Sequence, residues 1–244
     1  MFKKAIKYQM FEMKKAIITY YGIMLAMYMI PIIFLSVGTS GGRVSGMETT
    51  TVVFLFIIGL NSLKETFGMF LQNGLSRKTL FYSYTIKTMI VSMIMALISN
   101  ISGTLGEAFY NFDSLFMQIY RGRYLTEISP LVRFIDTFLW MTFLYMVAAM
   151  LGYFIIILYY RMNDKLKIIV SVGVPTFFII GIPLIEYNWT NGAISRGIFS
   201  FVAYTSGYTN GYNPYYFMAT SAVVLVVLGG LSYLLLKKAI VKTS

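Results

Sequence analysis

Long apolar runs alternate with short polar segments along the whole chain. A helix that crosses a membrane needs about 20 predominantly apolar residues, so runs of this kind predict where such helices lie. The runs cover residues 16–37, 51–63 with a continuation to 71, 80–105, 132–160, 168–185 and 214–236. We therefore predict an all-α integral membrane protein with six transmembrane helices.

The first residues of the chain follow a different pattern. Apolar side chains recur there at helical spacing, at Phe2, Ile6, Met10 and Met13. Lysines occupy much of the remaining helix surface, and a basic amphipathic helix of this kind lies in the membrane interface. The pattern predicts an interfacial helix at 1–15, followed by a six-span domain at 16–244.

The composition agrees with a membrane protein. Hydrophobic residues make up 58% and charged residues 12% of the 244 residues, and the mean hydropathy is +0.72. A soluble domain has about 25% charged residues, so a cytosolic enzyme, a secreted toxin and a disordered linker are excluded. The chain has no Cys and no His. This excludes disulfides and zinc–thiolate sites, and it removes the commonest general base.

The net charge of +11 is distributed unevenly along the chain. If the N-terminus is cytoplasmic and six crossings follow, 15 of the 20 Lys and Arg residues fall on the cytoplasmic side. Lys and Arg accumulate in the cytoplasmic loops of membrane proteins, so both termini are predicted to be cytoplasmic. The distribution assigns the positive charge to the membrane surface and its lipids, and no nucleic acid partner is expected.

The apolar runs carry few groups that could do chemistry. Arg133 and Asp136 are spaced i,i+3 and are expected to form an ion pair. The sequence contains no G-x-x-x-x-G-K-[ST] phosphate loop, so any ATPase must be a separate chain. We expect no enzyme activity from this chain by itself, no catalytic or metal site and no cofactor. A membrane-embedded enzyme and a non-transporting membrane scaffold or sensor stay as alternatives.

The connection at about 70–79 combines a short apolar helix, a glycine break and a serine that is suited to cap the next helix. Its residues are Phe70, Leu71, Gln72, Asn73, Gly74, Leu75, Ser76, Arg77 and Lys78. The apolar side formed by Phe70, Leu71 and Leu75 lies next to polar and basic groups, which suits docking into the groove of a partner. A tight basic turn without a partner is the alternative.

The stretch from Asn73 to Phe81 resembles the G-[hydrophobic]-S-R-K signature that follows the second span in permease subunits of type-two ABC exporters. The resemblance implies an ATP-driven exporter in which two permease chains pair, with a homodimer favoured over a heterodimer. Two separate P-loop ATPases would bind ATP and Mg in the cytoplasm and receive the segment Phe70–Lys78 as a coupling helix. A second cytoplasmic contact would be made by Arg161, Asp164 and Lys165.

The resemblance also carries expectations about the outer face and the cargo. The region at about 186–213 is similar to the family's external re-entrant segment, although its Gly, Asn and Tyr content predicts little regular helix. Small exporters of amphipathic peptides, of the toxin, bacteriocin or lantibiotic class, resemble this compact chain best. Exporters of lipids or glycans are similar in topology. The implied location is a bacterial plasma membrane.

Overall fold

The protein is described by a computed structural model that covers residues 2–37, 44–45, 47–63, 66–109, 112–124 and 128–237. It is helical throughout, apart from one parallel pairing of two-residue strands. The elements are α1 (Phe2–Val37), β1 (Val44–Ser45), α2 (Met47–Asn61), α3 (Thr66–Gln72), α4 (Arg77–Phe109), β2 (Phe112–Asp113), α5 (Leu115–Tyr124), α6 (Pro130–Arg161), α7 (Asp164–Thr176), η1 (Phe177–Gly181), α8 (Ile182–Ile185), η2 (Glu186–Thr190), α9 (Ala193–Thr205) and α10 (Pro214–Lys237).

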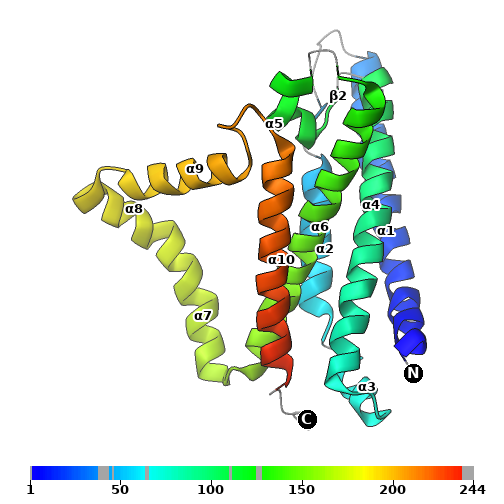
Figure 1. Ribbon diagram of the computed structural model, residues 1–244, viewed down its shortest axis with the longest axis vertical. Coiled ribbons are helices and arrows are strands. Elements are labelled where there is room, and N and C mark those ends of the chain that lie inside the picture. The colour runs from blue at the N-terminus through cyan, green and yellow to red at the C-terminus, as the bar shows by residue number, and fades with distance from the viewer. Residues whose placement is uncertain are drawn as a thin grey trace.

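Helix α6 is the centre of the bundle. Helices α2, α4 and α10 pack against it, and α1 packs on α4 (Figure 1). A helix that is apolar on all sides is buried in a larger bundle, and α6 has buried residues along its whole length from Asp136 to Ile157. The other helices of the bundle therefore take their positions from α6.

Four helices of the described residues are long and apolar enough to cross a membrane. They are Arg77–Ala108, Pro130–Arg161, Asp164–Thr190 and Pro214–Lys237, and they contain the predicted runs 80–105, 132–160, 168–185 and 214–236. The all-helical character is therefore confirmed, and these four helices are compatible with a multi-pass membrane protein. Helix α2 is apolar but has 15 residues, or about 22 Å at 1.5 Å per residue, which is shorter than a bilayer core of about 30 Å.

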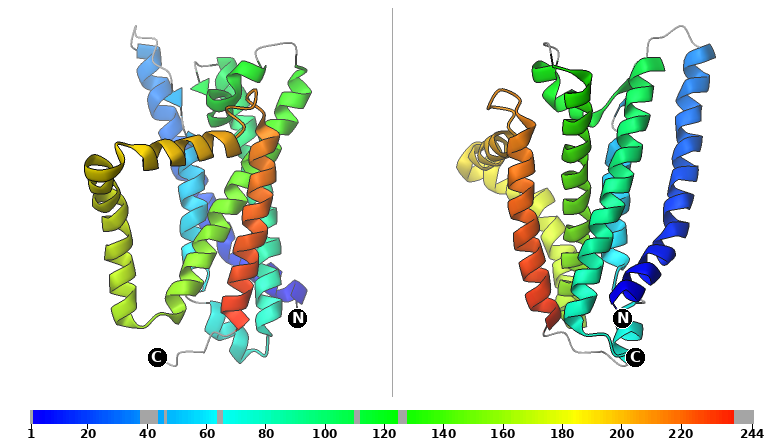
Figure 2. Two further views of the ribbon diagram at one scale, coloured as in Figure 1. Left: turned by 60° about the vertical axis from the view of Figure 1, so that its left-hand side comes forward. Right: turned by 45° about the vertical axis from the view of Figure 1, so that its right-hand side comes forward.

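The N-terminal segment 1–15 does not form a helix of its own, because α1 runs without interruption from Phe2 to Val37. One side of its first turns is buried, at Ala5, Gln9 and Met13. The Gln9 amide nitrogen donates to the hydroxyl of Ser83 on α4 at 3.4 Å. The first turns thus lie against the lower part of α4, as Figure 2 also shows.

The helix over Asp164–Thr190 leaves the bundle, and α9 returns to it (Figures 1 and 2). It stays helical past Pro175 and Pro183, and two π-helical stretches, η1 and η2, occur along it. A proline cannot donate the usual helical hydrogen bond, and a π turn is one way in which a helix absorbs such a defect. The expectation of little regular helix at 186–213 is wrong, because α9 occupies 13 of these residues.

Candidate functional site

The turn between α3 and α4 lies at the end of the bundle that also holds the start of α1 and the end of α10 (Figure 1). Helix α3 ends in two backbone hydrogen bonds of 3.0 Å, from Leu75 to the carbonyl of Phe70 and from Gly74 to that of Leu71. This pattern is a Schellman motif, which requires a left-handed residue after the helix. Gly74 supplies it with a φ of 75°. The glycine break in the sequence therefore has a definite role.

Ser76 begins the next helix as predicted. Its hydroxyl accepts a hydrogen bond from the backbone N–H of Thr79 at 3.1 Å, which is the bond expected of an N-cap residue. Arg77 follows and is half-buried; its guanidinium donates to the carbonyl oxygen of Lys237 at 2.6 Å. This bond ties the start of α4 to the end of α10, so Arg77 has an internal structural role in addition to any external one.

The apolar side of α3 faces inward rather than outward. Phe70 is 5% exposed, and its ring meets that of Tyr8 edge to face at 5.7 Å between centroids. Leu71 and Leu75 pack on the same buried cluster. Burying apolar area is favourable, and the chain's own helices supply the surface that a partner was expected to provide. The predicted apolar docking face is therefore occupied.

A polar tip remains on the outside of this turn. We define it by its exposed residues, Gln72, Asn73, Gly74, Ser76 and Lys78. The tip and the predicted second contact lie at the same end of the bundle (Figure 1). In that second segment, Arg161, Asp164 and Lys165 are all exposed. A surface of this composition can form hydrogen bonds and ion pairs with a protein partner, and its predicted role in binding an ATPase stays a prediction.

The start of α7 is locally well specified. The side chain of Asn163 accepts a hydrogen bond from the backbone N–H of Leu166 at 2.9 Å, and Asp164 pairs with Lys167 at 2.9 Å. An N-cap and an acid in the first turn both stabilise a helix start. These interactions stabilise the first turn of α7, where the helix leaves the bundle.

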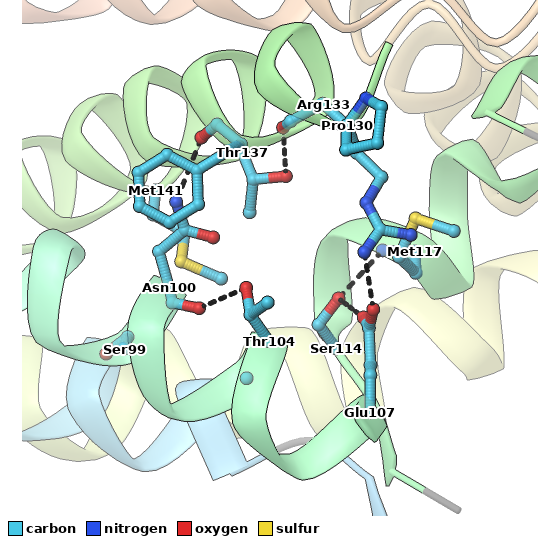
Figure 3. Close-up of a pocket in the computed structure, with 12 residues that line it drawn as sticks. Ser99, Asn100, Thr104, Glu107, Ser114, Met117, Pro130, Arg133, Thr137 and Met141 are labelled. Carbon is cyan, nitrogen blue, oxygen red and sulfur yellow. Dashed lines mark hydrogen bonds and ion pairs between the residues drawn. The ribbon is translucent and has the colours of Figure 1, made fainter. Parts of the chain in front are cut away.

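The opposite end of the bundle holds a network of polar side chains. Arg133 on α6 reaches Glu107 on α4 at 2.9 Å, and the hydroxyl of Ser114 donates to the same carboxylate at 3.2 Å (Figure 3). These groups line a cavity of about 80 Å³. The amide of Asn100, also at this cavity, donates to the carbonyl oxygen of Phe134 at 2.9 Å. The described side chains therefore satisfy one another here.

The predicted ion pair between Arg133 and Asp136 is wrong. Asp136 is buried and accepts hydrogen bonds from the hydroxyls of Tyr124 at 2.6 Å and Tyr215 at 2.9 Å. Burial and these contacts raise the pKa of Tyr124, so its phenol stays protonated and donates at neutral pH. Local sequence spacing does not indicate that Tyr124 lies beside Asp136, because that placement depends on how α5 packs on α6.

The remaining buried polar groups of this end link helices. Among the described residues, no three or more Asp and Glu side chains lie together as potential metal ligands. Burial raises the pKa of Tyr120 to about 12, and its hydroxyl is occupied, since it accepts from Trp140 at 3.1 Å and donates to the carbonyl of Ser206 at 2.8 Å. These groups join helices to one another. The sequence analysis does not identify Glu48 as a candidate site residue. Its indication in the sequence is an acid at the start of an apolar run.

Comparison with protein-family models, with curated proteins and with solved structures found no match for this chain.

Proposed function

We propose that this chain is the membrane-spanning permease subunit of an ATP-driven exporter. It pairs with a second permease chain and with separate P-loop ATPase subunits, and its cargo is an amphipathic peptide. Helix α1 and the shorter helix α2, around which a bilayer thins locally, supply two spans in addition to the four long apolar helices, with both termini in the cytoplasm of a bacterial cell. ATP and Mg are bound by the partner.

The observation that carries this proposal is the polar tip between α3 and α4. It presents hydrogen-bonding side chains and the Lys78 cation at the basic end of the bundle, on a turn fixed by Gly74 and Ser76. Helix α3 is anchored in the core through Phe67 and Phe70. A displacement of α3 by a bound partner would therefore move the membrane-spanning helices as well. The tip is thus suited to coupling.

The helix over Asp164–Thr190 supports an assembly of more than one chain. It is the most apolar of the four long helices, and no residue in its most apolar 18-residue stretch is buried. In a membrane, helices associate through close van der Waals packing and interhelical hydrogen bonds. The exposed surface of this helix is available for such packing. In the proposed assembly, the second permease chain packs against it.

The cargo class rests on composition. The chain has 20 Phe, 20 Tyr and 17 Met, and flexible Met side chains together with aromatic rings adapt to varied apolar ligands. An amphipathic peptide presents such an apolar side. Lipid and glycan cargoes are outcomes that a transport assay on the purified complex distinguishes.

The proposal is tested by purifying the tagged chain from its native membrane in mild detergent. We expect a stoichiometric P-loop partner of about 25–35 kDa, the size of one domain of roughly 250 residues, with vanadate-sensitive ATP hydrolysis. The variant Gln72→Ala/Lys78→Glu changes two exposed tip residues without touching the Ser76 cap or the Arg77 bond, and it should release the ATPase.

The matched control is Asn188→Ala/Arg196→Glu, which changes two exposed residues far from the tip, Asn188 near the end of the long helix and Arg196 on α9. This control should retain the ATPase. A chain that purifies alone and without ATP hydrolysis, under conditions that preserve membrane complexes, contradicts the proposal. Retention of the ATPase by the tip variant would remove the tip from the coupling surface.

A further inference from the structure

Two acids are buried among the described residues, and Glu48 lacks the hydrogen-bond partners that Asp136 has. Glu48, in the first turn of α2, is 3% exposed, and neither of its carboxylate oxygens has a hydrogen-bond partner among the described residues. The backbone N–H groups of Glu48 itself and of Leu115 lie nearby, but neither makes a hydrogen bond to the carboxylate. Among the described residues, the charged side chain that acts on it is Glu107, which has the same sign.

An uncompensated carboxylate in such a place is unfavourable. Removing an ionised group from water is costly unless an opposite charge and hydrogen bonds replace the water. Glu107 gives no relief, because it repels Glu48 and is itself paired with Arg133. The position of Glu48 therefore calls for a positive charge, either a bound proton or a bound cation, that the described side chains do not supply.

Glu48 lines a cavity of about 110 Å³ between α1, α2 and α4. The hydroxyl-bearing side chains that line it with Glu48 are Tyr20, Tyr21, Thr51, Ser99 and Ser102. Two hydrogen bonds position some of these oxygens. The hydroxyl oxygen of Tyr20 lies 2.7 Å from that of Thr51, and the hydroxyl of Tyr145 donates to that of Ser99 at 3.0 Å. A space of this size holds a small ion and several waters.

We propose that this cavity binds one monovalent cation, Na⁺, with Glu48 as its charged ligand. Carboxylate and hydroxyl oxygens suit hard cations. A single carboxylate neutralises a monovalent ion, whereas a divalent ion would leave a buried positive charge. The bound ion ties α1 to α2 and α4. This inference does not depend on the proposed exporter function, because it concerns the stability of the permease chain alone.

The test is the thermal stability of the purified full chain in detergent, measured in NaCl and in choline chloride at equal ionic strength. We expect Na⁺ at about 100 times its Kd to raise the Tm by roughly 5–10 °C. Glu48→Gln should abolish this rise, because the amide keeps the shape but not the charge. Thr51→Ala removes one oxygen and should raise the Kd for Na⁺ by roughly tenfold or more. This variant provides the test if Glu48→Gln does not fold.

The control variant is Glu12→Gln, which changes an exposed acid of α1 and should keep the full Na⁺ effect. Equal Tm values in Na⁺ and choline for the unaltered chain would overturn the proposal, as would a Na⁺ effect that persists in Glu48→Gln. Stabilisation by acid pH without any Na⁺ effect would assign a proton to Glu48 instead. Arg43 lies outside the described residues; if Arg43→Gln destabilised a Na⁺-insensitive chain, Arg43 would be the counter-charge and the cation site would be refuted.

Discussion

The contact between α2 and α6 gives a sharp prediction, because two glycines bring their backbones together. A Cβ atom placed on Gly152 would lie 3.0 Å from the Cα of Gly59 and 3.0 Å from the N of Leu60, and still closer to the carbonyl oxygen of Phe56. A Cβ on Gly59 would meet Gly152 and Tyr153 at 2.9 Å. Ordinary carbon contacts lie at about 3.5–4.0 Å, so Gly152→Ala requires the two helices to separate by about 1 Å.

The neighbours that would have to move are backbone atoms of helices, so no side chain can rotate away to make room. Overpacking of this kind costs about 1–3 kcal/mol. For a chain of this size, that loss lowers the melting temperature by roughly 2–12 °C. Because α3 follows α2 after only four residues of sequence, we expect the same separation to displace the polar tip. We therefore expect Gly152→Ala to weaken ATPase binding in the proposed complex as well as stability.

The assay is thermal unfolding of the purified chain in detergent, followed by circular dichroism. Gly230→Ala is the matched control, since it lies inside α10 and a Cβ there has no described atom within 4 Å. The control should be neutral or slightly stabilising, because alanine favours helix over glycine. If Gly152→Ala melted at the same temperature as the unaltered chain, the close approach of α2 and α6 would be refuted.

Three further predictions follow from particular contacts. Tyr120→Phe leaves Trp140 and the Ser206 carbonyl without their partner and should cost about 1–3 kcal/mol. Because the pKa of Tyr120 is raised from 10.0 to about 12, its contribution is present below pH 10 and is lost as the pH rises to about 12, so the variant should lose less stability over that range. Asn163→Ala removes the α7 cap and should cost about 1 kcal/mol by the same unfolding assay; an unchanged Tm would show that the cap contributes nothing. The chain has no native Cys, so an impermeant thiol reagent added outside intact cells should label Tyr187→Cys but not Ser244→Cys, and the reverse pattern would exclude cytoplasmic termini.

Much of the fold follows from local sequence. Four predicted apolar runs lie within the long helices because a run of apolar residues forms a helix wherever water is excluded. Ser76 and Gly74 were recognisable for a similar reason, since a cap and a left-handed turn depend on a few neighbouring residues. The candidate coupling turn could thus be located from the sequence, including the glycine break that ends α3 and the serine that caps α4.

Tertiary packing decided what the local pattern could not. The sequence pattern predicts that the apolar side of α3 is free for a partner, but α1 and the core bury Phe70. Local spacing predicts a pair between Asp136 and Arg133. Instead, Asp136 accepts hydrogen bonds from Tyr124 and Tyr215, which α5 and α10 bring from distant positions in the sequence. Glu48 is the extreme case. The sequence determined that an acid begins an apolar helix, and only the arrangement of α1, α2 and α4 enclosed it in a cavity where the described side chains supply no opposite charge.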